Sequence, residues 1–236
     1  MIYGSYVRGY YHAGRSDLDS VLIFSDDVVI DKKLLHEVST VVYKALQGKN
    51  DSMREIFQVT PLDRTTMLDG RFNSFTDDFC EYFKDEGKTV FGKDYRNEMV
   101  CLHKKTGKES RISHNLRKSR QALLFAEYDK REDYEQFLKG FLGTLNTVSR
   151  GSKEILSLID GKIRKDKLSS LTEMCEFFPD VDIEPLERIK DLYYHPTKLD
   201  DLYTNQDEVL KLWNSSLSFF EEVIRQYIVK FPRMSE

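Results

Sequence analysis

The spacing of apolar residues changes part of the way along the chain. In the first half, the short apolar run Val21–Phe24 is typical of a buried strand, Lys32–Leu46 has helical periodicity, and Ile56–Thr60 is rich in β-branched and aromatic residues. This order predicts a β-α-β unit. Phe75–Glu86 then has helical spacing, and Thr89–Phe91 is expected to form a last strand before Gly92.

From Asn115 onward the apolar residues recur only at helical spacing, and no segment has the alternation of a strand. The helical segments are Leu116–Tyr128, Tyr134–Ile159, Leu168–Phe178, Ile183–Tyr194 and Val209–Phe231. Pro179 and Pro196 each end the helix before them, because a proline disfavours helix at the preceding residue. The second half is therefore expected to be a helical bundle.

A polar stretch at residues 97–113 separates the two patterns and contains Gly107. We expect the domain junction here, which divides the chain into an α/β domain at residues 1–105 and an all-α domain at residues 106–236. The predicted fold class is α+β. At 236 residues the chain is long enough for two such domains.

Composition narrows the classes of partner. The 36 Lys and Arg residues against 40 Asp and Glu residues leave a formal net charge of -4, which disfavours broad charge-driven binding to nucleic acid. There is no apolar stretch of membrane-spanning length and no signal-peptide pattern. Cys80, Cys101 and Cys175 lack the paired spacing of a zinc site or disulfide framework. These features predict a soluble cytoplasmic protein with reduced cysteines and no membrane partner.

The residues that indicate chemistry lie at the start of the chain. Gly4 allows the backbone to approach a phosphate closely, and Ser5 supplies a hydroxyl that is expected to cap a short helix at residues 6–11. Asp17 and Asp19 follow where the chain enters a strand. Side chains two residues apart on a strand share one face, so both carboxylates are placed to hold Mg²⁺, while Leu18 points into the core.

This combination resembles the signature of the DNA polymerase β-like nucleotidyltransferase superfamily. The matching residues are Gly4-Ser5-x-x-Arg8-Gly9 and Ser16-Asp17-x-Asp19, and the pattern is most similar to small bacterial and archaeal members and to aminoglycoside nucleotidyltransferases. The resemblance implies a small mixed sheet flanked by helices, followed by a helical bundle. Members usually have a helix and a strand before the Gly-Ser pair, whereas here only Met1-Ile2-Tyr3 precede it.

The resemblance also implies an activity. Asp17 and Asp19 would bind two Mg²⁺ ions, and Gly4, Ser5 and Arg8 would bind the triphosphate of a nucleotide, for which ATP is the expected donor. The product would be a nucleoside monophosphate joined to a hydroxyl of an acceptor. An aminoglycoside-like small molecule, a protein side chain and an RNA end all remain open as acceptors.

The third carboxylate of this superfamily, a metal ligand or general base, is ambiguous here. Glu55 opens the segment that corresponds to the strand that carries it, and we select it as the catalytic base. Asp63 is the alternative, while Phe57 stands where small members have aspartate. If neither residue serves, the protein would be a binding module with the same fold, similar to an antitoxin, that does not turn over nucleotide.

Two features of the helical half carry competing interpretations. Arg188 and His195 resemble the Arg-x(4–6)-His motif of HEPN-domain ribonucleases, in which the histidine acts on a ribose hydroxyl, but we favour capping or packing at a helix end as the role of His195. A basic stretch is placed to hold phosphate between the domains, or else to form a solvated helix face. Its residues are Arg111, Arg117, Lys118 and Arg120.

Overall fold

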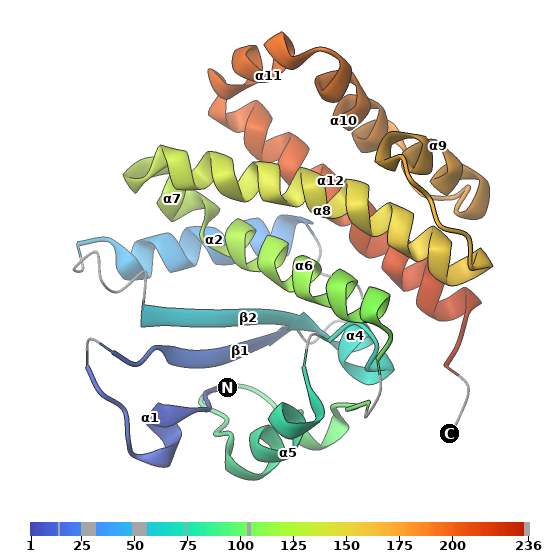
Figure 1. Cartoon of the computed structure of the whole chain (residues 1–236). Helices are drawn as coiled ribbons and strands as arrows, with labels where there is room; N and C mark the ends of the chain where they lie inside the picture. The colour runs from blue at the N-terminus through green and yellow to red at the C-terminus, as the bar shows by residue number, and fades with distance from the viewer. Residues whose placement is uncertain (14, 25–31, 49–55, 74, 103–104, 234–236) are drawn as a thin grey trace.

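Two parallel strands lie between two groups of helices in the computed structural model of the protein (Figure 1). The structure describes residues 1–13, 15–24, 32–48, 56–73, 75–102 and 105–233. Strand β1 (Leu18–Phe24) pairs in parallel with β2 (Phe57–Asp63), and helix α2 (Lys32–Leu46) lies between them in sequence. The predicted β-α-β order is confirmed.

The N-terminal residues extend this sheet by single bridges. Ile2 forms an isolated antiparallel bridge with Ser20 of β1 and another with Lys88. In the part of the chain that is described, these bridges are the only antiparallel pairing, so the mixed sheet implied by the family resemblance is present only in this reduced form.

One side of the strands is covered by short helices (Figure 1), and a cluster of aromatic side chains packs there. The short helices of this half are α1 (Ser5–Arg8), α4 (Arg64–Asp69), α5 (Asp77–Glu86) and the 3-10 helix η1 (Arg96–Glu98). The rings of Phe75 and Phe79 stack at 4.1 Å, and Tyr3 packs edge-on to Phe79 at 4.9 Å. Val21 and Leu62 bring the two strands into the same cluster.

The predicted strand at Thr89–Phe91 is wrong. Lys88 makes the single bridge to Ile2, and the residues after it form no strand. Val90 is 68% exposed and Phe91 is 93% exposed, so this apolar run has no core to pack against. An apolar run without a partner strand or a buried face gains nothing from the extended conformation.

The expectation that the cysteines are unpaired is also wrong. Cys80 of α5 and Cys101 form a disulfide that joins this helix to the segment after η1, with the two Cα atoms 5.9 Å apart. Cys175 is the free cysteine of the described chain. The pairing was missed because 21 residues separate the two positions, and only the folded helix brings them together. Reduced cysteines therefore no longer support the predicted cytoplasmic location, which remains a prediction.

Thiol titration of the denatured protein checks the disulfide. Before reduction, one reactive thiol per chain is expected, from Cys175, and after reduction all three cysteines should react. A Cys175→Ser variant serves as the control, since it should give none before reduction. Three thiols in the unreduced wild-type protein would contradict the pairing.

The second half of the chain is helical, as predicted. Its elements are α6 (Gly107–Leu124), α7 (Ala126–Glu132), α8 (Tyr134–Asp160), α9 (Lys167–Phe177), α10 (Glu184–Tyr194), α11 (Pro196–Tyr203) and α12 (Gln206–Lys230). Helix α6 begins within the polar stretch that was expected to be a junction, because Thr106 and Glu109 form a reciprocal capping box. Pro196 both follows α10 and opens α11, a position that proline favours.

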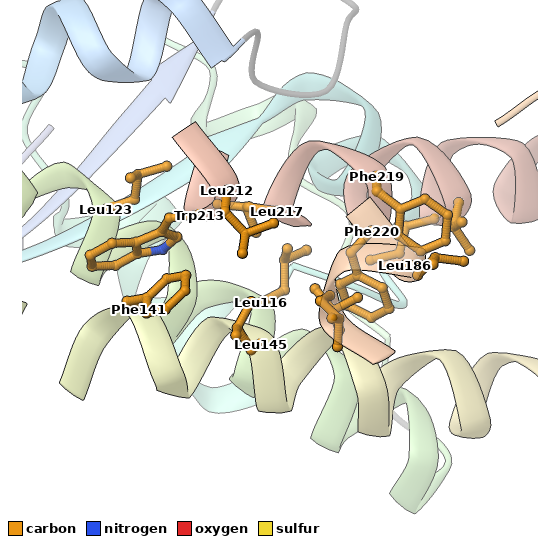
Figure 2. Packing of buried hydrophobic residues seen from close by; sticks show 14 of the residues in the cluster. Leu116, Leu123, Phe141, Leu145, Leu186, Leu212, Trp213, Leu217, Phe219 and Phe220 are labelled. Carbon is orange, nitrogen blue, oxygen red and sulfur yellow. The ribbon is translucent and has the colours of Figure 1, made fainter. Parts of the chain in front are cut away.

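The large hydrophobic core lies between α6, α8 and α12. Figure 2 shows Trp213 of α12 facing Phe141 of α8, and their rings are 6.2 Å apart. The same cluster includes Phe24, Leu46 and Phe72 from the first half of the chain. The helical half and one face of the sheet therefore share a core across the predicted boundary at residue 105, and the division into two domains remains a prediction.

A buried ion network ties the sheet to the helical half. Arg120 of α6 donates to Asp63 at the end of β2 (2.6 Å) and to Glu221 of α12 (2.5 Å), and all three side chains are at most 2% exposed. Burial raises the pKa of Glu221 to about 7, although Arg120 opposes this shift. The network fixes α6 between the strands and α12.

Among the described helices, none is both long enough and apolar enough to cross a lipid bilayer.

Candidate active site

The two aspartates lie where the chain enters β1. Asp17 is exposed immediately before the strand, and Asp19 is half-buried as its second residue. Strand alternation places the Asp19 side chain on the face opposite Leu18, whereas Asp17 lies one residue before β1, so the shared face of the two aspartates stays a prediction. Burial, and secondarily the charge of Asp17, raise the pKa of Asp19 to about 6. A cation between the two carboxylates would relieve this repulsion.

Gly4 lies directly against the carboxylate of Asp19. A Cβ at position 4 would stand 2.4 Å from Asp19 Oδ2, and the residue has a φ of +76°, which favours glycine. The backbone N–H of Tyr3 donates to the Asp19 carbonyl at 3.1 Å. The turn at Gly4 therefore fixes both the backbone and the side chain of Asp19.

A Gly4→Ala substitution is expected to displace the Asp19 carboxylate. The added methyl group occupies the space that Oδ2 now fills, and the backbone at Gly4 (φ 76°, ψ -152°) lies in a region that is essentially restricted to glycine, where a side chain costs about 1–3 kcal/mol. Mg²⁺ binding, measured by calorimetry, should weaken about tenfold or more, as for loss of a residue that orients a metal ligand. Gly9→Ala is the matched control, because Gly9 also has a positive φ but its Cβ would meet no atom within 4 Å. Equal Mg²⁺ affinity in both variants would contradict the role of Gly4.

The expected capping role of Ser5 is wrong. Gly4 occupies the N-cap position of α1, Ser5 is its first helical residue, and no side chain caps this end. With four residues, α1 is one turn long, so its end provides little of the dipole of a full helix. Any contact between Ser5 and phosphate would depend on its hydroxyl and on the nearby backbone.

Arg8 is already engaged by neighbouring side chains. Its Nε donates to Glu86 of α5, its Nη1 donates to the Tyr10 hydroxyl at 3.0 Å, and its guanidinium lies 4.8 Å from the Tyr82 ring centroid. These contacts tie α1 to α5. A role in binding triphosphate stays a prediction for Arg8 and would require part of this network to rearrange.

The two candidates for the third carboxylate, Glu55 and Asp63, differ in what the structure says of them. Glu55 lies outside the described residues. Asp63 caps α4 by accepting from Thr66 N at 2.8 Å, is fully buried, and pairs with Arg120. Asp63 is an odd number of positions from Gln58, the residue aligned with Asp19, so it faces the other side of the sheet. The structure does not bring Asp63 to Asp17 and Asp19.

Gln58 was missed by the sequence reasoning. The parallel register pairs it with Asp19, so the two side chains project from the same face of adjacent strands. Sequence alignment by motif had placed Phe57 at this position. The alternation of the β2 residues was the available signal, since Val59 belongs with the core and Gln58 does not.

Two tyrosines also border Asp19. Burial raises the pKa of the Tyr3 hydroxyl, the charge of Asp19 adds to this shift, and the same two effects raise the pKa of Tyr82. Tyr3 packs against Tyr82 at a ring separation of 6.5 Å. One side of the aspartate pair is thus an aromatic wall from the N-terminal segment and α5, which no motif indicated.

Binding of Mg²⁺ by Asp17 and Asp19 stays a prediction; two carboxylates would suffice for one ion, because Mg²⁺ is commonly bound by one or two carboxylates, with water and substrate phosphate completing its octahedron. No group of three or more His, Cys, Asp or Glu side chains suited to a metal occurs in the described ranges. Within these ranges, no third carboxylate joins the two aspartates to bind the second Mg²⁺ ion of the expected pair.

The HEPN-like residues are in contact with charged neighbours. Arg188 pairs with Glu208 of α12 at 3.5 Å, and His195, which is the C-cap of α10, lies 3.7 Å from Asp191. Asp191 is also paired with Lys198 at 2.7 Å. These contacts agree with helix-end packing, and the ribonuclease interpretation stays a prediction.

No family model, curated protein sequence or solved structure matches the chain. The resemblance to nucleotidyltransferases therefore rests on the residues of the motif and on their arrangement.

Proposed function

We propose that the protein is a Mg²⁺-dependent nucleotidyltransferase that moves a nucleoside monophosphate from a nucleoside triphosphate, with ATP as the expected donor, to a hydroxyl group. Asp17 and Asp19 would hold the metal, and Gly4 and Ser5 would lie against the triphosphate. The acceptor would be a small molecule similar to an aminoglycoside, a protein side chain or an RNA end.

One observation carries this proposal: Gly4 and Asp19 form a single unit. The half of the motif that would bind phosphate contacts the half that would bind metal, with no room for a side chain between them. Two parts of the motif that are 15 positions apart thus meet at one point. A capped turn and two unrelated surface aspartates would not require this contact.

The protein groups have separable tasks in this reaction. Asp17 and Asp19 orient and hold the cation, and the turn at Gly4 positions the phosphates beside it. Bound Mg²⁺ would neutralise phosphate charge and favour ionisation of the attacking hydroxyl. If Glu55 reaches the site, it would accept the proton of that hydroxyl.

A binding module without turnover is the second candidate, and the register of the sheet favours it specifically. The side chain aligned with Asp19 on the adjacent strand is the amide of Gln58, which can accept a hydrogen bond or ligate a metal but cannot serve as a base. In this case the site would bind a nucleotide and leave it intact.

A transfer assay separates the candidates. The protein is incubated with each α-labelled nucleoside triphosphate and one acceptor class at a time: aminoglycosides, polypeptides including the protein itself, and RNA oligonucleotides. We expect label on an acceptor with Mg²⁺ and none with EDTA. Mg²⁺-dependent nucleotide binding without transfer to any acceptor would favour the binding module. Cleavage of the RNA that is abolished by His195→Ala but not by Asp19→Ala would favour the ribonuclease.

A further inference from the structure

Helix α6 turns one face toward the strand next to the aspartate pair. Gln121 Nε2 lies 3.3 Å from Gln58 Oε1, and Gln58 is the residue of β2 that pairs with Asp19. Arg117 precedes Gln121 by four residues, so it lies on the same face one turn away. This face of α6 therefore packs against β2, and Arg117 lies one turn from the contact with the residue that pairs with Asp19.

Arg117 differs from the other arginines of its helix. Arg111 pairs with Glu154 at 2.6 Å, and Arg120 pairs with two buried carboxylates. Nε of Arg117 is buried and has no hydrogen-bond partner, and no ion pair of this residue occurs among the described residues. A buried donor on a charged group is costly to leave unpaired, so the position calls for an anion.

The electrostatics of neighbouring groups agree with this placement. The charge of Arg117 opposes the upward shift in the pKa of the Tyr3 hydroxyl that burial and Asp19 produce, so Arg117 and Asp19 both act on this hydroxyl. Burial lowers the pKa of His114, and the charges of Arg117 and Lys118 lower it further. The positive charge of Arg117 therefore acts both on its own helix and on a tyrosine that borders Asp19.

We propose that Arg117 is a phosphate-binding residue that holds phosphoryl groups of the nucleotide at the edge of the site formed by β2. The proposal rests on the nucleotidyltransferase or nucleotide-binding function proposed above. A planar guanidinium can donate two parallel hydrogen bonds to one phosphoryl group, and a phosphate would supply the negative charge that Arg117 lacks; contact with the buried Nε itself would require the side chain to turn outward. The triphosphate would then lie between the metal held by the aspartates and the cation held by α6.

The test measures binding of inorganic tripolyphosphate without metal, and of ATP with Mg²⁺, by titration calorimetry on the full chain. Arg117→Gln is expected to raise both dissociation constants about tenfold or more, as for loss of a hydrogen-bonded charge pair. Arg117→Lys, which keeps the charge but not the planar fork, should recover part of the affinity. Arg111→Gln is the matched control from the same helix and should bind both probes as the wild type does.

The same binding measurements distinguish failure of the Arg117 proposal from failure of the proposed nucleotidyltransferase or nucleotide-binding function. Asp19→Asn should weaken binding of ATP with Mg²⁺ but not binding of metal-free tripolyphosphate, whereas Arg117→Gln should weaken both. Nucleotide binding that requires Asp19 and is unchanged in both Arg117 variants overturns the role of Arg117 and leaves the proposed function intact. Binding of tripolyphosphate that requires Arg117, with no Mg²⁺-dependent nucleotide binding, supports the phosphate site and contradicts the proposed function.

Discussion

Replacement of Arg120 by methionine is expected to destabilise the protein by about 3–5 kcal/mol. The substitution keeps most of the side-chain volume and removes the cation, so Asp63 and Glu221 would remain buried without a partner of opposite charge. Urea unfolding at neutral pH measures the change. Arg111→Met is the control: Arg111 is on the same helix, but its side chain is 59% exposed and pairs with Glu154, so its loss should cost about 1 kcal/mol or less.

The deficit of Arg120→Met should grow as the pH rises. The pKa of Glu221 in the folded protein is about 7, above the value of an ordinary glutamate, so the folded state holds its proton more tightly than the unfolded state does. Stability from such a group is present at low pH and is lost as the pH rises through the folded-state pKa. Without Arg120 this pKa rises further and the loss deepens. A deficit that is smaller at about pH 8 than at about pH 5 would contradict the network.

Replacement of Asp19 by asparagine is expected to lower the rate of Mg²⁺-dependent nucleotide transfer by at least about a hundredfold. Asparagine keeps the shape of the side chain but removes the negative charge that holds the cation. The effect should exceed that of Asp17→Asn, because Asp17 is exposed, whereas Asp19 is held in place by Gly4 and by the backbone of Tyr3. The measurement is initial rate of pyrophosphate release under saturating acceptor.

Asp200→Asn provides the matched control for this measurement. Asp200 is an exposed aspartate of α11, far along the chain from the motif, so its substitution changes the net charge equally without touching the site. Its rate should equal that of the wild type. If Asp19→Asn and Asp200→Asn lose activity to the same extent, the carboxylate of Asp19 is not a metal ligand in the reaction.

Periodicity predicted the long helices of the second half because they bury apolar stripes in a common core, whereas α11, which has no buried residue, was missed. Helix α2 was predicted with its observed bounds, and α8 differs by one residue at its C-terminal end. The start of α6 was placed nine residues too late, because its first turns are polar and only the capping box at Thr106 and Glu109 marks them. Local capping chemistry, rather than hydrophobicity, decides that boundary.

The extent of the sheet and the disulfide were not predicted correctly from the sequence. The run at Thr89–Phe91 has the composition of a strand, yet its place in the sheet depends on a neighbour that a one-dimensional pattern does not contain. The pairing of Cys80 with Cys101 likewise depends on how α5 packs. Both features are set by contacts between distant segments.

For the candidate site, the sequence predicted the candidate residues themselves but not the residues that contact them in the fold. The position of Asp19 as the second residue of β1 agrees with the predicted strand, because the strand period is local, while the shared face of Asp17 and Asp19 stays a prediction. The alignment of Gln58 with Asp19 required the register between two strands, and the unpaired Nε of Arg117 required the packing of α6 on β2. Arg8 was assigned to phosphate by its place in the motif, whereas its contact with Glu86 comes from another helix.

Helix α6 carries two arginines with opposite surroundings, three residues apart: Arg117 faces the candidate site without a partner, and Arg120 is locked between Asp63 and Glu221. An anion that binds Arg117 would stabilise the same helix that holds the core together, by the linkage between binding and folding. The melting temperature of the whole protein is therefore a direct reporter of occupancy at the sheet, and ligands of unknown identity can be found by their effect on it.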